Sequence, residues 1–462
     1  MLFLLKRARW HVFLALLLGL LLRLWFIHAY PLVDGDSLIY GDIAKNWFWH
    51  GVYGLTVKRG IQPTLIRLPG YPLFLAGCFR LFGMEHYLAV LYTQTAVDLS
   101  TYLLVAAFAA RYVSLRCGIV ALYLAALCPF TANYVASPLT ETLSLFCIAL
   151  GLYAFARYVE HPRLNGWFFA LTLDICYAAL LRPDGALLGV VLLPAMFWFA
   201  RKQIAASRAA TLAVLCAALT LLPFVAWTVR NARTFHVFQP LVPRSATDPH
   251  EYVDKGWNQW VKTWCAEFTS TYEIYWSISG APVDVNDLPT RAFDTPAEYA
   301  RTAALFDKYD TTLVLTPQMD AQFEQLARAR IARHPMRYYV VLPVLRLTDM
   351  WLRPRTEMLW IELRWWQFRH HEAETIFAWS YAGLNLAYLL AALWGMRKRV
   401  PYTSLMVAYV LLRCLLLLTL EYPEPRYTLE CFPMIFLLAA AALTVRGTTA
   451  LTSERSSSSL SS

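Results

Sequence analysis

Charged residues are scarce in this chain of 462 residues. Asp, Glu, Lys and Arg together make up 16% of it, whereas 58% of the residues are hydrophobic and 15% are aromatic. Apolar runs long enough to cross a bilayer recur along the sequence. This composition argues against a single soluble domain and predicts a multi-pass membrane protein.

The chain also lacks the cysteine patterns of disulfide-rich and zinc-binding proteins. Its nine cysteines are isolated or lie in apolar stretches, and no CxxC pair is present. An HExxH motif is absent as well. His370, His371, Glu372 and Glu374 have metal-ligand side chains in another order, so we interpret them as a solvated flank. We therefore predict no metal site and no certain cofactor, while a divalent cation is left open.

A nucleic-acid partner is not indicated either, despite a net charge of +10. Many of the basic residues stand in short clusters between apolar runs, which is typical of membrane topology signals. No small-residue cleavage site follows the first apolar run, so we interpret that run as a retained helix rather than a signal peptide.

Ten apolar runs are suitable for helices across the bilayer, which predicts an all-α membrane protein. The basic clusters in the short loops place both termini in the cytoplasm under the positive-inside rule. The polar loops then face the exported side. The ten runs cover approximately residues 11–29, 87–112, 117–136, 139–159, 167–181, 186–200, 211–229, 376–395, 402–420 and 429–445.

The order of the runs divides the chain into four parts. We predict an N-terminal transmembrane module at residues 1–229, whose first exported loop spans 31–86, and a second exported region at 230–375. C-terminal transmembrane helices at 376–446 and a disordered cytoplasmic tail at 447–462 complete the chain.

Three features stand out in the second exported region. Residues 296–334 predict one strong helical stretch, and residues 338–351 predict a re-entrant or interfacial helix. Trp257, Trp260 and Trp264 recur at helical spacing. We predict that they anchor an interfacial helix, with stacking on a sugar as the alternative.

Short polar motifs gather on the exported side. The first loop contains DSLIYGDIA at residues 36–44, HGVYG at 50–54 and RLPGYP at 67–72. Later loops contain PLTE at residues 138–141, LRPDG at 181–185, VRN at 229–231 and EPRY at 424–427. Each motif is weak alone, but their order and their common side of the membrane make the set fairly specific.

In this order the motifs resemble those of the polytopic GT-C glycosyltransferases of glycosyltransferase family 39. These include bacterial relatives of the protein O-mannosyltransferases and the aminoarabinose lipid A transferases. The resemblance covers most of the chain and is least clear at residues 230–375. It implies a GT-C-like bundle that takes a sugar from a polyprenyl-phosphate donor. The acceptor would be a lipid, glycan or protein at the periplasmic face of a bacterial inner membrane.

Asp36 matches the position of the family's catalytic aspartate, through its spacing to Tyr40 and Ala44. Transfer from a lipid-phosphate sugar needs a base for the acceptor hydroxyl and cations for the departing phosphate. Asp34 is the competing choice for the base. Capping of the following helix is the alternative role for both acids.

The remaining candidate residues surround this base in the exported motifs. Arg67, Arg182 and Arg426 are predicted phosphate contacts, with snorkelling or local ion pairs as the alternatives. The predicted substrate-binding residues are Asp34, Tyr40, Arg67, Tyr71, Glu141, Arg182, Arg426 and Tyr427.

Asp98, Asp174 and Arg413 lie inside predicted spans, where ionisable groups are costly and often functional. They keep a transporter or a flippase of lipid-linked sugars as the alternative function. Such proteins usually show repeated halves, and no internal repeat is present. A non-catalytic scaffold is the third hypothesis.

Overall fold

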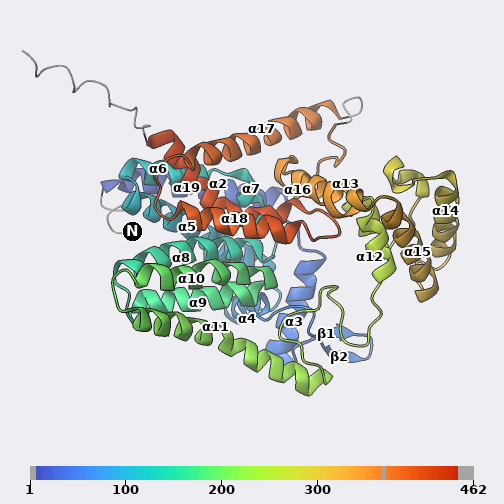
Figure 1. Cartoon of the computed structure of the whole chain (residues 1–462), viewed down its shortest axis with the longest axis horizontal. Coiled ribbons are helices and arrows are strands. Elements are labelled where there is room, and N and C mark those ends of the chain that lie inside the picture. Colours follow the sequence, from blue (N-terminus) through green and yellow to red (C-terminus); the bar gives the residue numbers. More distant parts are fainter. Residues whose placement is uncertain (1–6, 367–370, 446–462) are drawn as a thin grey trace, which may run out of the picture.

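The computed structural model describes residues 7–366 and 371–445. The described chain is helical apart from one antiparallel pair of strands. Figure 1 shows most of the long helices lying side by side as a bundle. The bundle contains α2 (Arg9–Ala29), α5 (Tyr87–Tyr112), α6 (Leu115–Ala126), α7 (Pro129–Asn133), α8 (Glu141–Glu160), α9 (Gly166–Leu181), α10 (Ala186–Ala200), α11 (Ala206–Phe235), α17 (Glu372–Gly395), α18 (Thr403–Leu417) and α19 (Phe432–Thr444).

The predicted class, an all-α multi-pass membrane protein, is confirmed. Among the described residues, seven helices are long and apolar enough to cross a membrane. An eighth span is present if Leu115–Ala126 and Pro129–Ala136, bent by 48°, cross together. The ten predicted runs all form helices, but α9 and α18 have only 16 and 15 residues. Pro183 follows α9 closely, and the residue before a proline disfavours helical dihedrals, so α9 ends early.

The segment between α2 and α5 forms a small layer that packs against one end of the bundle. It contains α3 (Asp36–His50), the hairpin of β1 (Gly54–Val57) and β2 (Gly60–Pro63), and α4 (Gly70–Phe82). Asp42 ties α3 to the hairpin, because its carboxylate accepts hydrogen bonds from the Thr56 amide at 2.6 Å and the Thr56 hydroxyl at 2.8 Å.

Gly70 allows α4 to meet α9 backbone to backbone. A Cβ at this position would lie 2.5 Å from the carbonyl carbon of Leu180. Only glycine permits so close an approach. The first loop is therefore fixed to the end of α9, next to Arg182.

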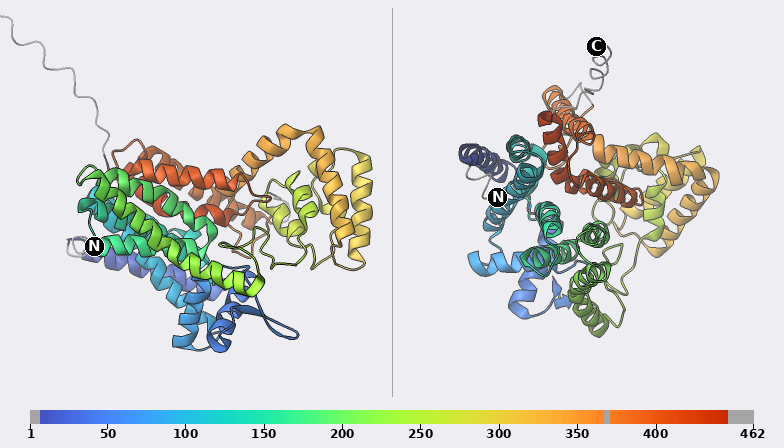
Figure 2. Two further views of the ribbon diagram at one scale, coloured as in Figure 1. Left: turned by 60° about the horizontal axis from the view of Figure 1, so that its bottom comes forward. Right: turned by 60° about the vertical axis from the view of Figure 1, so that its left-hand side comes forward.

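Residues 255–333 form a small helical domain beside the bundle, at the right of Figure 1 and in both views of Figure 2. Its main helices are α12 (Lys255–Lys262), α14 (Pro296–Asp310) and α15 (Pro317–Arg333). Trp257, Trp260 and Trp264 form the centre of its core and are at most 1% exposed. Both roles predicted for these tryptophans, membrane anchoring and sugar stacking, are therefore wrong.

The helical stretch predicted at residues 296–334 is two helices rather than one. Leu313 has a φ of 52°, which a right-handed helix does not allow. After this turn, Thr316 caps α15 by accepting a hydrogen bond from the Met319 amide. Pro317 occupies the first helical position, where its missing N–H costs nothing.

A long connection leads from the small domain back to the bundle. The predicted helix at residues 338–351 is present as a π-helical turn at Arg337–Val341 followed by α16 (Leu342–Leu352). Asp349 in α16 accepts a hydrogen bond from the Phe268 amide at 2.9 Å, which attaches α16 to α13 (Phe268–Ser270). The predicted tail at 447–462, Arg446 and His370 lie outside the described residues.

The other described elements are short helical turns. They are the 3-10 turns Tyr134–Ala136, Pro183–Gly185, Val285–Asp287, Thr290–Ala292 and Pro425–Cys431, and the π-helical turn Thr271–Tyr275.

Candidate functional site

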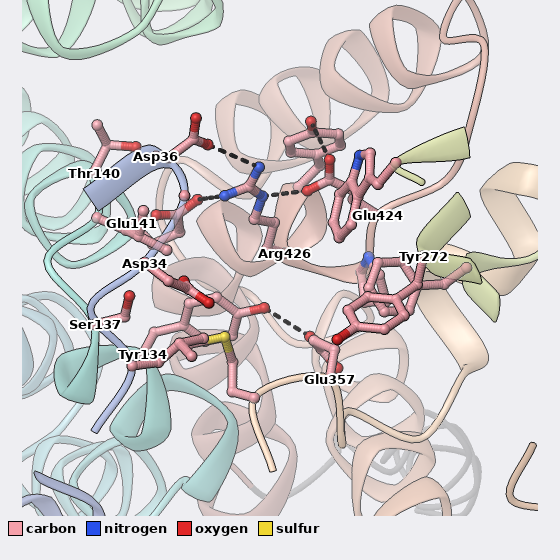
Figure 3. A pocket seen from close by; sticks show the side chains of 18 of the residues that line it. Asp34, Asp36, Tyr134, Ser137, Thr140, Glu141, Tyr272, Glu357, Glu424 and Arg426 are labelled. Carbon is pink, nitrogen blue, oxygen red and sulfur yellow. Dashed lines mark hydrogen bonds and ion pairs between the residues drawn. The ribbon is translucent and has the colours of Figure 1, made fainter. Parts of the chain in front are cut away.

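A cavity of about 1070 Å³ opens between α3, the start of α8, the end of α9, the turn before α19 and the coil after α16. This volume is slightly above the usual range for small-ligand pockets, about 300–1,000 Å³. Figure 3 shows several of its carboxylates pointing toward Arg426. The predicted site residues that line the cavity are Asp34, Asp36, Tyr40, Arg67, Glu141, Arg182, Arg426 and Tyr427.

Tyr71 is the one predicted site residue that does not line this cavity. It is fully buried behind Tyr40, with the two ring centroids 5.0 Å apart. Its hydroxyl donates a hydrogen bond to Gln94 Oε1 at 2.6 Å. Tyr71 therefore supports the ring of Tyr40 from behind.

Asp36 stands at the first position of α3 and faces two arginines. Its Oδ1 accepts a hydrogen bond from the Arg67 guanidinium at 2.6 Å, and its Oδ2 accepts one from Arg426 at 3.4 Å. The residue that caps α3 is Gly35, and no side chain caps this helix end. The capping role considered for Asp34 and Asp36 is thus wrong.

The two arginines determine the charge state of Asp36. Burial opposes ionisation of its carboxyl group, but the positive charges of Arg67 and Arg426 outweigh burial and hold the pKa of Asp36 below its usual value. Asp36 is therefore ionised at physiological pH, the state that a general base requires. Asp34 also lines the cavity, and its exposed carboxylate forms no ion pair with any described residue.

Arg426 and Arg182 are each shared among several carboxylates. The Arg426 guanidinium forms an ion pair with Glu424, and one of its nitrogens lies 3.9 Å from a Glu141 carboxylate oxygen. Arg182 pairs with Glu141 at 3.0 Å and with Asp184 at 3.1 Å. The local ion pairs considered as alternatives thus exist, yet the same guanidinium groups also line the cavity.

Arg67 has a simpler environment. Its carboxylate partner is Asp36, and its guanidinium also donates to the backbone carbonyl of Ile66 at 3.0 Å. The guanidinium carbon lies 5.6 Å from the ring centroid of Tyr40, within cation–π range. Burial raises the pKa of Tyr40 to about 12, so this ring is neutral.

A second group of buried charges lies next to Arg182. Arg413 of α18 pairs with Glu430 at 2.6 Å and with Asp184 at 3.1 Å. Glu430 also lies 3.7 Å from Arg182. These buried charges fix the guanidinium of Arg182 in the cavity wall.

One protein-family model matches residues 63–227, the segment that carries Arg67, Glu141 and Arg182. The matching family is dolichyl-phosphate-mannose-protein mannosyltransferase. The predicted resemblance to this family is confirmed over the segment, whereas Asp36 and Arg426 lie outside it.

Two membrane proteins of known structure are similar to the chain at low identity. One is the archaeal oligosaccharyltransferase AglB from Archaeoglobus fulgidus, solved with an inhibitory peptide and a dolichol-phosphate, at 12% identity and a TM-score of 0.49 over 96% of this chain and 50% of that one. The other is ArnT from Cupriavidus metallidurans bound to undecaprenyl phosphate, at 14% identity and a TM-score of 0.41 over 94% and 77%. The chain spans about half the length of the archaeal protein. No curated protein matches it significantly.

Several residues of the site were not among those predicted from sequence to bind substrate. Glu424 is the first residue of the EPRY motif, and Glu430 lies three residues after its end; both pair with arginines of the site. Acids next to an arginine at the start of a span are a signal that could have found them. Tyr134 donates a hydrogen bond to Glu357 at 2.8 Å across the cavity wall. Neither residue belongs to a motif.

Metal-ligand side chains are dispersed in this region. Within residues 7–366 and 371–445, no group of three or more His, Cys, Asp or Glu side chains is arranged to hold a metal ion.

Proposed function

We propose that this chain is a GT-C-type membrane glycosyltransferase that moves a sugar from a polyprenyl-phosphate donor to an acceptor hydroxyl in the cavity. The observation that carries the proposal is Asp36 held between Arg67 and Arg426 in the cavity wall. A base beside cations is what glycosyl transfer from a phosphate requires. The mannosyltransferase-family match supports the donor class.

In the proposed reaction, the acceptor hydroxyl gives its proton to Asp36 while its oxygen attacks the anomeric carbon of the donor sugar. The bond between that carbon and the phosphate oxygen breaks, and its electron pair leaves with the polyprenyl phosphate. Arg67 and Arg426 stabilise the negative charge that develops on this oxygen. Asp36 then returns the proton to water.

Donor binding and base strength are coupled in this arrangement. A phosphate bound at Arg67 draws that guanidinium away from Asp36, because both anions use the same donors. Loss of a nearby positive charge raises the pKa of a carboxyl group. Asp36 thus becomes a stronger base once the donor is in place.

The pH profiles of kcat/KM and of kcat are therefore expected to fall at different acidic pH values. The limb of kcat/KM reports the free enzyme, where the arginines hold the pKa of Asp36 below the ordinary value of about 3.9. The limb of kcat reports the donor complex and is expected at higher pH. In both profiles the rate falls as the pH drops through the pKa, because the base must be deprotonated. Coincident acid limbs would contradict the coupling.

A test of the function itself is mass analysis of lipid-linked sugars and surface glycans in cells with and without this protein. We expect the donor to accumulate, and one glycan residue to be missing, in cells that lack the protein. The purified protein is expected to release polyprenyl phosphate from that donor. Unchanged donor and glycan pools would reject the proposal.

The cavity is proposed to face the exported side, as the basic clusters in the short loops predict.

The alternative function, a transporter, was considered because ionisable groups lie inside predicted spans. Asp98 pairs with Arg23 at 2.8 Å, and Arg413 pairs with Glu430. Ion partners therefore account for their burial without a transported ligand. Asp174 forms no ion pair in the described part of the chain and is the residue that a transport assay would address.

A further inference from the structure

The cavity has a second wall, which the proposed reaction does not use. It is built from α13 and the turn after it, from the coil at residues 357–363, and from residues 371–374 at the start of α17. In Figure 3, Tyr272 and Glu357 of this wall lie across the cavity from Asp36 and Glu141. The wall lies outside the mannosyltransferase-family segment at residues 63–227.

Open aromatic rings cover much of this wall. Tyr272, Trp276 and Trp360 line the cavity, although they are 54%, 44% and 73% exposed. Tyr272 and Trp276 are held edge to face, with centroids 5.8 Å apart. Trp360 packs edge to face against Tyr30, with ring centroids 5.6 Å apart. Large rings left open inside a cavity indicate a ligand with an apolar face.

Carboxylates alternate with these rings. Glu357 is fixed by the hydrogen bond from the Tyr134 hydroxyl. The backbone amide of Glu362 donates a hydrogen bond to the Glu374 carboxylate at 2.9 Å. Glu273 lines the same wall and carries its own partner, Arg364, at 2.7 Å. These groups accept hydrogen bonds and repel anions.

The opposite wall, which carries Asp36 and Glu141, has one more hydrogen-bond acceptor that the proposed reaction does not use. Glu141 lines the cavity with its side chain only 2% exposed, and its Oε2 has no hydrogen-bond partner in the described structure. An unmet buried acceptor is costly unless a ligand supplies a donor. A ligand with hydrogen-bond donors would satisfy this acceptor.

Apolar faces and many hydroxyl donors occur together in a sugar ring. Its C–H face packs on an aromatic ring, while its hydroxyls donate to carboxylates at the rim. A polyprenyl tail has no donors and would bury the carboxylates of this wall without partners. A phosphate-bearing or acidic acceptor would be repelled by them.

We propose that this second wall is an acceptor subsite for an uncharged saccharide, whose rings pack on Tyr272, Trp276 and Trp360 and whose hydroxyls donate to Glu357 and its neighbouring carboxylates. The inference rests on the proposed function, since it names the acceptor of that reaction.

Binding of short neutral oligosaccharides tests the subsite without any transfer step. The probes are mannose and N-acetylglucosamine oligomers of two to four units, an acidic trisaccharide and a serine-rich peptide, each titrated into the full chain in lipid nanodiscs. We expect a neutral oligomer to bind, and Tyr272→Ala and Glu357→Gln to weaken it about tenfold or more. Tyr272→Ala removes an exposed side chain and should leave the fold intact, which a thermal unfolding midpoint checks.

Matched controls are Tyr339→Ala and Glu324→Gln, which change an exposed tyrosine and an ion-paired glutamate away from the cavity. Both should bind as the unchanged protein does. Asp36→Asn should also keep saccharide binding, so a failure of the transfer reaction is distinguishable from a failure of the subsite. The subsite is overturned if no neutral oligomer binds, if the acidic probe or the peptide binds better, or if Tyr272→Ala binds normally.

Discussion

Replacing Asp36 with asparagine is expected to lower the rate of sugar transfer by about 10²–10⁴-fold, the usual contribution of a general base. Asparagine has nearly the same shape and still offers an oxygen to Arg67, but it cannot take up the hydroxyl proton. The measurement is release of polyprenyl phosphate from a defined donor by the purified protein. We expect kcat to fall without a rise in the donor KM, because Arg67 and Arg426 are freed for the phosphate.

Two aspartate variants serve as controls for this result. Asp34→Asn changes the other carboxylate of the same turn, which lines the cavity and forms no ion pair within the described residues, and should reduce transfer less than tenfold. Asp42→Asn disturbs the hairpin contact with Thr56 and should leave kcat within a few-fold. A larger loss in Asp34→Asn than in Asp36→Asn would move the role of base to Asp34.

Replacing Arg426 with glutamine is expected to reduce both stability and transfer. Its partners Glu424 and Glu141 have side chains only 3% and 2% exposed. Removal of one member of a buried ion pair typically costs about 3–5 kcal/mol, because a charge is left uncompensated. Burial already raises the pKa of Glu424, although Arg426 opposes that effect, so this carboxyl group should take up a proton in the variant. The denaturation midpoint in detergent measures the loss.

The double variant Arg426→Gln with Glu424→Gln separates the two effects. It removes both charges of the pair, so we expect part of the lost stability to return. Transfer should stay low, because the phosphate contact is still missing. An Arg426→Gln protein as stable as the unchanged chain would show that these ion pairs do not support the fold.

Much of the bundle could be predicted from apolar runs, since a lipid environment leaves few structures in which backbone polar groups are satisfied. The gathering of Arg67, Arg182 and Arg426 in one cavity agrees with the prediction that all three lie on the same side of the membrane. The roles predicted for Trp257, Trp260 and Trp264 were wrong, because helical spacing shows only that such residues share a face. It does not show whether that face meets lipid, ligand or a protein core.

Other parts of the site could not be read from local sequence. Tyr134 and Glu357 are 223 residues apart, and their hydrogen bond depends on how the coil after α16 crosses the bundle. The break between α14 and α15 depends on Leu313, whose left-handed conformation is rare for leucine. Such contacts follow from tertiary packing, which has no short sequence signature.

The shortness of α9 has a consequence for how a lipid-linked substrate could approach. A helix of 16 residues rises about 24 Å, whereas the hydrocarbon interior of a bilayer is about 30 Å thick. If its amino-terminal end sits at one surface, Arg182 at the other end stops several ångströms below the opposite headgroups. The leaflet must thin there or water must enter. A phosphate could then meet the guanidinium at that depth while its isoprenoid chain stays dissolved among the acyl tails.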